Sequence, residues 1–153
     1  MYSKDEASRL KEEFWTSFGQ YMSLLPTTEG SKINWINYKT GVKHVYFKMQ
    51  ADKRSASIAI EITHTDPGMQ ALVFEQFQEL RIILQNCIKE SWDWDLHTTD
   101  EYGKIISRIY KVLPDVSIFK KEDWPELISF FKPRIIALKE FWEDAQYSFD
   151  VFK

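Results

Sequence analysis

The stretch from Val42 to Thr63, VKHVYFKMQADKRSASIAIEIT, decides the fold because it contains two alternating segments separated by charged residues. In each segment apolar side chains occupy every second position, and a period of two places them on one face of a β-strand. The charged residues between the segments lack an Asn-Gly or Asp-Gly pair, which favours a loop of about three to five residues. The stretch therefore predicts a β-hairpin with one apolar face.

Helices are predicted on both sides of this hairpin. Apolar residues recur at three- and four-residue spacing in residues 10–25, 66–89 and 127–142. Ser3, Asp66 and Asp123 are candidate N-caps for the three helices. Pro133 lies inside the last pattern, whose phase continues beyond it, so we expect one kinked helix there.

Three further segments have the composition of strands. Residues 33–38 and 102–111 are rich in β-branched and aromatic side chains, and residues 92–97 alternate strictly, whereas PTTEGSK at 26–32 is typical of a turn. The order is then helix, three strands, helix, two strands, helix. This order predicts an α+β fold in which an antiparallel sheet of about five strands is covered by three helices.

Length and composition indicate one globular domain over residues 1–153. The chain has 153 residues, of which 44% are hydrophobic and 16% aromatic, so it can bury a sizeable core. The sequence contains no run of about 18 apolar residues, and its first residues lack the apolar segment of a signal peptide. We therefore expect a cytoplasmic protein. The aromatic tail at residues 147–152 is expected to pack on the core or on another subunit.

Positive charge is concentrated in one part of an acidic chain. Residues 32–54 carry a net charge of +5, so the remainder carries -8 within a total of -3. Cations interleaved with aromatic rings suit phosphates and unstacked bases. The candidate binding surface consists of Trp35, Lys39, Lys43, Tyr46, Lys48, Lys53, Arg54 and Arg108. The alternative is that the lysines only guard a solvated hairpin edge, with Trp35 facing the helices and Tyr46 covering a neighbouring strand.

Enzyme signatures are weak. No glycine-rich phosphate loop and no GxSxG motif occurs. Asp52 and Glu61 do not complete a nuclease motif, because no lysine stands two positions after Glu61. Asp93, Asp95 and His97 share one face of a predicted strand, yet no other histidine has a spacing that completes a metal site, so solvent-facing roles are favoured. No catalytic residue, cofactor or metal is predicted.

Several segments together resemble a known family, the domain of unknown function 4268 family. The resemblance rests on Asn34-Trp35-Ile36-Asn37 with Gly41, the alternating run to Glu61, Ser107-Arg108-Ile109, and Asp123-Trp124-Pro125-Glu126-Leu127. It extends from the first helix to about Trp142. Members of the family often resemble C-terminal companions of restriction-endonuclease-like domains in bacteria and archaea. The resemblance therefore implies a role near nucleic-acid processing, without implying any catalytic residue.

Three functional hypotheses follow, in order of preference. The first is a non-enzymatic binding or accessory module of nucleic-acid processing, with nucleic acid or a nuclease-like protein as its partner and no membrane contact. The second is a protein-interaction domain that forms a homodimer without touching nucleic acid, and the third is an enzyme with an unrecognised site. Binding that weakens steeply with salt separates the first hypothesis from the second.

Overall fold

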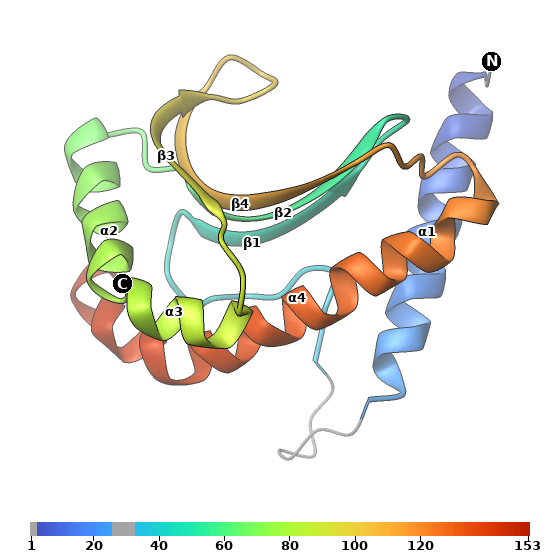
Figure 1. The fold of residues 1–153 in the computed structure, drawn as a ribbon. Helices are drawn as coiled ribbons and strands as arrows, with labels where there is room; N and C mark the ends of the chain where they lie inside the picture. The colour runs from blue at the N-terminus through green and yellow to red at the C-terminus, as the bar shows by residue number, and fades with distance from the viewer. Residues whose placement is uncertain (1–2, 26–32) are drawn as a thin grey trace.

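The computed structural model, which describes residues 3–25 and 33–153, combines one antiparallel sheet with four α-helices in those residues. The helices are α1 (Lys4–Ser23), α2 (Pro67–Glu79), α3 (Arg81–Ile88) and α4 (Trp124–Ala145), with short 3-10 helices η1 (Lys121–Asp123) and η2 (Gln146–Phe152). The strands are β1 (Val45–Ala51), β2 (Ser55–Ile62), β3 (Asp93–Thr99) and β4 (Ile105–Pro114). Their order across the sheet is β1-β2-β4-β3. Helices α2, α3 and α4 lie on one side of the sheet (Figure 1), and the predicted α+β class is confirmed.

The β1–β2 hairpin forms as the alternating sequence predicts. Phe47 is paired with Ile60, and Met49 with Ile58, on the side of the sheet that faces the helices. Ile58 and Ile60 are fully buried because that face packs against the helical layer. Residues 52–54 connect the strands, so the predicted loop length is confirmed. The intervening side chains of each strand point to the open face.

Strands β3 and β4 form a second hairpin, as predicted, and it bends away from the helices. The pairing register shifts between Asp95 and Thr98, and His97 adopts a positive φ of 53°. An extra residue in one strand of an antiparallel pair bends that strand and increases its twist. Figure 1 shows the hairpin curling over the side of the sheet opposite the helices. The open face is therefore concave.

Trp142 of α4 is central to the core. Its ring centroid lies 5.1 Å from that of Phe149 and 6.1 Å from that of Phe77. Its indole Nε1 donates a hydrogen bond to the backbone oxygen of Thr40 at 2.8 Å, which ties α4 to the loop before β1. Phe149 is fully buried in this cluster, so this part of the aromatic tail packs on the core, which is one of the two predicted alternatives, whereas Tyr147 and Val151 are exposed.

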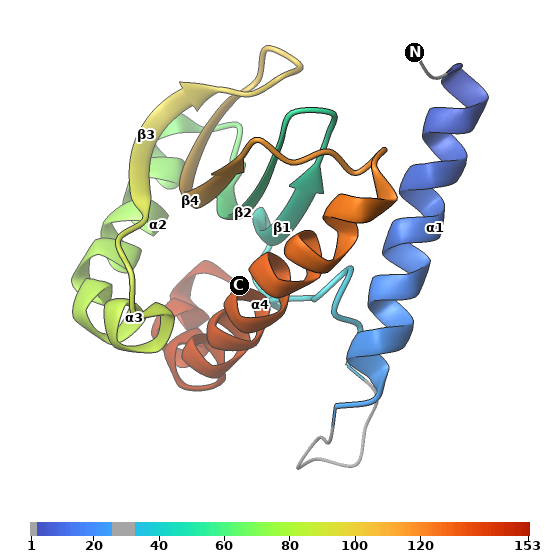
Figure 2. The ribbon, with the colours of Figure 1, turned by 45° about the vertical axis from the view of Figure 1, so that its right-hand side comes forward.

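Helix α1 lies against the first half of α4. The Ser3 side chain accepts a hydrogen bond from the backbone of Glu6 at 3.2 Å, so the predicted N-cap is confirmed. Phe14 and Phe18 of α1 are fully buried, and both rings pack against Phe131 of α4. Figure 2 shows the two helices crossing beside the end of the sheet.

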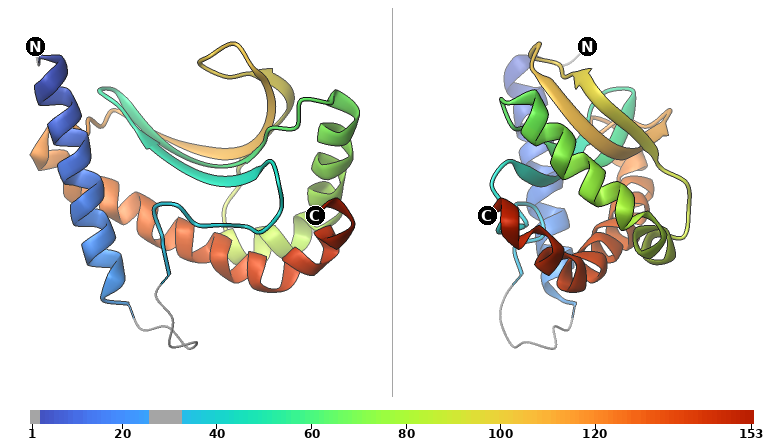
Figure 3. Two further views of the ribbon diagram at one scale, coloured as in Figure 1. Left: turned by 180° about the vertical axis from the view of Figure 1, so that it is seen from behind. Right: turned by 90° about the vertical axis from the view of Figure 1, so that its left-hand side faces the viewer.

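The predicted strand at residues 33–38 is wrong, and the sheet of the described chain has four strands rather than five. The side chain of Asn34 accepts a hydrogen bond from the backbone of Asn37 at 3.0 Å, which closes a turn instead. The left view of Figure 3 shows the segment that leads to β1 passing below that strand. The predicted turn at 26–32 lies outside the described residues.

The predicted helix over 66–89 is two helices. Asp66 caps α2 as expected, since its carboxylate accepts hydrogen bonds from the backbone of Gly68 and Met69 at 2.7 and 3.1 Å. Leu80 then leaves the helical conformation, with φ -95° and ψ 10°, and α3 begins at Arg81. The described chain therefore has four α-helices instead of the predicted three.

Helix α4 is continuous through Pro133, which confirms the prediction of one helix, and Figure 1 shows it curving under the sheet. Asp123 occupies the predicted N-cap position of α4, but its side chain does not cap the helix. Its carboxylate accepts a hydrogen bond from the backbone of Ser117 at 2.9 Å and makes no hydrogen bond that caps α4. Asp123 therefore holds the β4–α4 connection.

Candidate binding cleft

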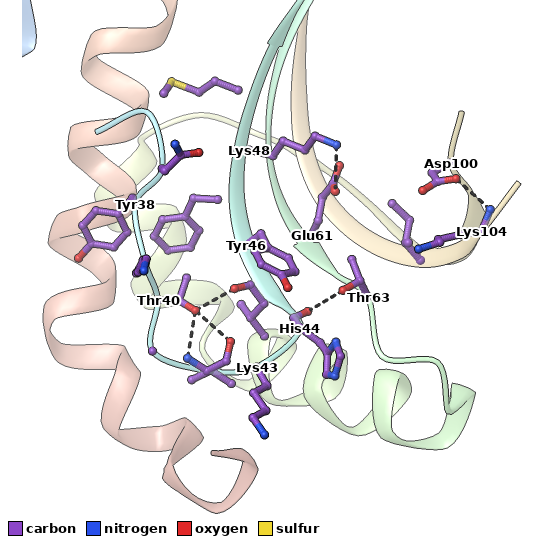
Figure 4. A pocket seen from close by; sticks show the side chains of 18 of the residues that line it. Tyr38, Thr40, Lys43, His44, Tyr46, Lys48, Glu61, Thr63, Asp100 and Lys104 are labelled. Carbon is purple, nitrogen blue, oxygen red and sulfur yellow. Dashed lines mark hydrogen bonds and ion pairs between the residues drawn. The ribbon is translucent and has the colours of Figure 1, made fainter. Parts of the chain in front are cut away.

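A cleft of about 1260 Å³ surrounds β1 and contains several of the predicted binding residues. It has an edge arm, lined by Trp15, Ile36, Tyr38, Phe47 and Met49, and a face arm, lined by Tyr46, Lys48, Glu61, Asp100 and Lys104. Figure 4 shows Tyr38 on one side of β1, with Tyr46, Lys48 and Glu61 on the other. The cleft therefore reaches both the outer edge of the sheet and its concave open face.

The loop before β1 is held by Thr40. The Thr40 hydroxyl donates to the backbone oxygen of Val45 at 2.8 Å and accepts from the backbone N–H of Val42 at 3.2 Å. Gly41 between them has φ 80°, a left-handed conformation that glycine adopts without strain. These contacts fix the backbone that carries Lys39 and Lys43, both exposed at the cleft.

Charges of both signs lie on the face arm. Lys48 Nζ is 3.8 Å from a carboxylate oxygen of Glu61. Glu61 is half-buried, and burial raises the pKa of its carboxyl above the ordinary value of 4.5, despite the opposing charges of Lys48 and Arg108. Ionising Glu61 in the folded protein therefore costs free energy, and the charge of Lys48 offsets only part of this cost.

Arg108 lies on the same open face, directly across from Glu61 in the β2–β4 register. Its guanidinium carbon is 4.2 Å from the centre of the Tyr110 ring, and its Nε is 3.9 Å from a carboxylate oxygen of Asp95. The Tyr110 hydroxyl donates to Asp95 at 2.8 Å, and this hydrogen bond is the main reason that the pKa of Tyr110 is raised. The cluster orients Arg108 beside the cleft without making it part of the lining.

The structure brings some of the predicted surface together and separates the rest. Lys39, Lys43, Tyr46 and Lys48 all line the cleft, and Tyr46 is 52% exposed. Lys53 and Arg54 are exposed in the β1–β2 loop, outside the cleft lining. Trp35 is only 7% exposed and belongs to the core, so it is not available as a stacking ring. Its predicted stacking role is corrected.

Sequence reasoning missed the contribution of the β3–β4 loop. Asp100 and Lys104 line the face arm, and the backbone N–H groups of Tyr102 and Lys104 donate to the Asp100 carboxylate, each at 2.9 Å. Gly103 has φ 81°, which permits the tight turn. The sequence Tyr102-Gly103-Lys104 was a detectable signal for an exposed aromatic and cationic turn, but only the curl of the hairpin brings it over β1.

The acidic strand does not form a metal site. Asp95 binds Tyr110, whereas the positive φ of His97 turns its ring away, and its Nε2 lies 3.0 Å from the backbone oxygen of Pro67. In the described residues, no group of three or more histidine, cysteine, aspartate or glutamate side chains is arranged to hold a metal ion. The alternative metal hypothesis therefore gains no support from this strand.

The fold and cleft define a class: an α+β domain whose antiparallel sheet is backed by helices on one face and open on the other. The chain belongs to the family described as Domain of unknown function (DUF4268), whose model matches residues 10–146. No curated protein and no solved structure matches the chain. No helix within the described residues is long and apolar enough to span a membrane.

Proposed function

We propose that this chain is a non-enzymatic binding module of nucleic-acid processing that holds single-stranded nucleic acid in the face arm of the cleft. The observation that supports this proposal is the exposed Tyr46 ring, which projects between lysines in an otherwise acidic protein. The cleft lining contains four lysines and two acidic residues, whereas the whole chain has a net charge of -3. A polyanion is thus attracted locally and repelled elsewhere.

The side chains of the face arm match the chemistry of an unpaired strand. An aromatic ring stacks on a base of any sequence, and lysines bind phosphates without reading bases. The ion pair of Lys48 with Glu61 does not prevent this, because its two atoms are 3.8 Å apart and the Lys48 side chain is 42% exposed, so a phosphate can reach the ammonium group. We therefore expect binding to single strands with little sequence preference.

The test is a titration of the unmodified protein with single- and double-stranded oligonucleotides at several salt concentrations. We expect the single strand to bind more tightly, with an affinity that falls as salt rises because counterions are released. If neither oligonucleotide binds below about 100 μM at low salt, the weak limit of ordinary non-specific affinity, the nucleic-acid function is wrong.

Two sets of variants assign the binding to the face arm. Tyr46→Ala should weaken single-strand binding by roughly 1–3 kcal/mol, the value of one stacked base, with little effect on duplex. Tyr147→Ala is the matched control, since Tyr147 is 66% exposed but lies outside the cleft. Equal losses in the two tyrosine variants would contradict the assignment.

The lysines are tested by charge removal. Replacing Lys43, Lys48 and Lys53 together by glutamine should weaken binding similarly for all sequences and flatten its salt dependence by up to about three phosphate contacts. Because Lys53 lies outside the cleft, Lys53→Gln alone should account for the smallest part of that change. A dominant effect of Lys53 would move the binding surface to the β1–β2 loop.

A further inference from the structure

The outer edge of β1 carries unpaired backbone groups. Thr63 donates its backbone N–H to the oxygen of His44, and Asp52 donates its own to the oxygen of Ser55. The pairs His44–Thr63 and Asp52–Ser55 are therefore hydrogen-bonded pairs of the hairpin. Because such pairs alternate along an antiparallel ladder, the even-numbered residues of β1 direct their N–H and C=O groups to β2. The odd positions direct theirs outward. In the part of the chain that the structure describes, no hydrogen bond reaches the outward groups of Phe47 or Met49.

The outward backbone groups of Val45, at the start of β1, already have hydrogen-bond partners, so the unpaired part of the edge begins after Val45. The backbone oxygen of Val45 accepts a hydrogen bond from Thr40, and its N–H donates to the oxygen of Val42 at 3.3 Å. The loop then passes below β1 (Figure 3), where the Tyr38 ring stacks on Phe47 with centroids 5.5 Å apart. The edge arm of the cleft follows the strand from Val45 to Met49.

Proteins usually protect such an edge. Proline, a bulge, a covering element or a charged side chain, especially lysine, reduces the risk of pairing with another strand. The sequence of β1, VYFKMQA, has no proline, and its pairing with β2 runs without a register shift. Lys48 is the one charged residue in the strand, and its side chain points to the open face. The edge of β1 is therefore able to accept a further strand.

We propose that an extended, acidic segment of a partner protein pairs with β1 and becomes a fifth strand of the sheet. An added strand forms backbone hydrogen bonds with Phe47 and Met49, and its side chains alternate between the two faces. One set packs against the edge arm, where Ile36, Tyr38 and Met49 offer apolar surface. The other set points to the side of Lys43 and Lys48, which favours glutamate and aspartate.

A second copy of this chain fits the edge less well. Pairing β1 with β1 of another copy brings together two segments that each contain Lys39, Lys43, Lys48, Lys53 and Arg54. Like charges repel most strongly where they are brought close and partly desolvated. An acidic partner strand neutralises the same lysines, so charge selects a different protein over self-association.

This proposal does not depend on nucleic-acid binding. The lysines of the cleft attract any anion. A row of backbone donors and acceptors at strand spacing, however, is complementary to another peptide strand and has no counterpart in a sugar–phosphate chain. The two proposals therefore predict different ligands. They share Lys43 and Lys48, but only the peptide strand uses the outward backbone groups of Phe47 and Met49.

The experiment uses the full chain and a fluorescent, end-capped peptide in which glutamate alternates with leucine, of the same length as β1. Two modified peptides carry N-methyl groups on alternate residues, one on the odd and one on the even positions. Only one of these sets directs its N–H groups at β1. We expect the unmodified peptide to bind saturably and one methylated peptide to bind at least about tenfold more weakly, since each lost hydrogen bond costs up to about that factor, while the other keeps its affinity.

Protein variants test the same edge from the other side. Met49→Pro removes an outward N–H that takes no part in the hairpin, and proline is tolerated at such edge positions. It should weaken the peptide about tenfold, whereas Met49→Ala, which keeps the N–H, should weaken it less. If Met49→Pro does not fold, the two methylated peptides still test the proposal, because they are used with the unchanged protein.

Three outcomes overturn the proposal. The first is that the unmodified peptide does not bind at concentrations up to about 1 mM, which corresponds to a binding free energy of about 4 kcal/mol. The second is that both methylated peptides bind equally well. The third is that a peptide with lysine in place of glutamate binds as well as the original. Displacement of the peptide by a single-stranded oligonucleotide, together with equal binding of both methylated peptides, would assign the whole cleft to nucleic acid. A protein that binds oligonucleotides but not the peptide retains the proposed function and loses only this inference.

Discussion

The two faces of the β1–β2 hairpin are built from alternate residues of the same strands, yet their surroundings are opposite. On the covered face, Ile58, Ile60 and Ile62 are all fully buried beneath the helices. On the open face, Tyr46 is 52% exposed, and Lys48 lies 3.8 Å from Glu61 of the neighbouring strand. One face contains side chains that water cannot reach, and the other contains charges and a ring that a ligand can reach.

This difference separates stability from binding. Burying one isoleucine side chain contributes about 1.5–3 kcal/mol. The attraction between Lys48 and Glu61, by contrast, is opposed by the cost of burying the Glu61 charge. The covered face therefore supplies most of the hairpin's share of the folding free energy. The open face contributes little to stability, so its residues are free to serve a partner.

The largest expected effect comes from the covered side. Trp142→Ala removes a 1% exposed ring that packs on Phe77 and Phe149, together with the hydrogen bond to Thr40. We expect the free energy of unfolding to fall by about 3–5 kcal/mol, as for other large aromatic truncations. Urea denaturation measures this loss. Tyr46→Ala is the control on the open face and should change stability by no more than about 0.5 kcal/mol. Similar losses in the two variants would refute the division between the faces.

An effect of intermediate size on stability is expected at Glu90, which links the α3–β3 connection to Arg134 of α4. Both carboxylate oxygens of Glu90 accept hydrogen bonds from Arg134 at 2.8 Å, and one also accepts from Trp92 Nε1 at 2.8 Å. Burial alone favours the neutral acid, but the hydrogen bonds outweigh it, and the pKa of Glu90 is lowered from 4.5. The folded state thus favours the ionised carboxylate.

Glu90→Gln should lower the free energy of unfolding at neutral pH by about 1.5–3 kcal/mol, the range for hydrogen bonds to a charged group. A lowered pKa in the folded state gives stability that is present above the unfolded value of 4.5 and is lost as pH falls through the folded value. The difference between the two proteins should therefore shrink in acid. Chemical denaturation across pH measures it, with the exposed Glu79→Gln as control. A difference that persists below the folded pKa would contradict this account.

The covered face was predictable from sequence because the spacing of apolar residues along a strand or helix indicates which side chains are buried. The alternation of residues 45–62 predicted the hairpin, and the period in residues 127–142 predicted a continuous α4 despite Pro133. The break at Leu80 was not predictable in this way, since no glycine or proline marks it and the apolar pattern continues. Leu84 of α3 is buried and α3 packs against α4, and such a tertiary contact leaves no mark in the local apolar pattern.

The candidate site was only partly predictable, because a binding surface depends on which strands become neighbours. Tyr46 and Lys48 were found from their alternation with buried residues, and both line the cleft. Trp35 was misassigned because its β-rich segment has no strand partner, and the Asn34 turn directs the ring into the core. Lys104 was missed because its place over β1 results from the curl of the β3–β4 hairpin, which sequence period does not encode.

Glu61 provides the smallest effect and the sharpest contrast between the faces. Its pKa is raised, chiefly by burial, so the folded protein favours the protonated acid more than the unfolded chain does. As pH rises through the window between 4.5 and the raised value, the unfolded chain releases its proton first, and stability falls. At neutral pH the ionised Glu61 is therefore a cost to the fold, even beside Lys48 and Arg108.

Glu61→Gln should consequently raise the free energy of unfolding slightly at neutral pH, because glutamine keeps the shape of the protonated acid without its ionisation. The gain should disappear below pH 4.5, where Glu61 is protonated in both states. The same variant leaves Lys48 without its acidic partner, so single-strand binding should become tighter while the fold becomes more stable. Denaturation curves and oligonucleotide titrations at neutral and acidic pH measure both changes. A loss of stability at neutral pH would show that the ion pairs outweigh burial, and that the open face, like the covered face, is built for stability.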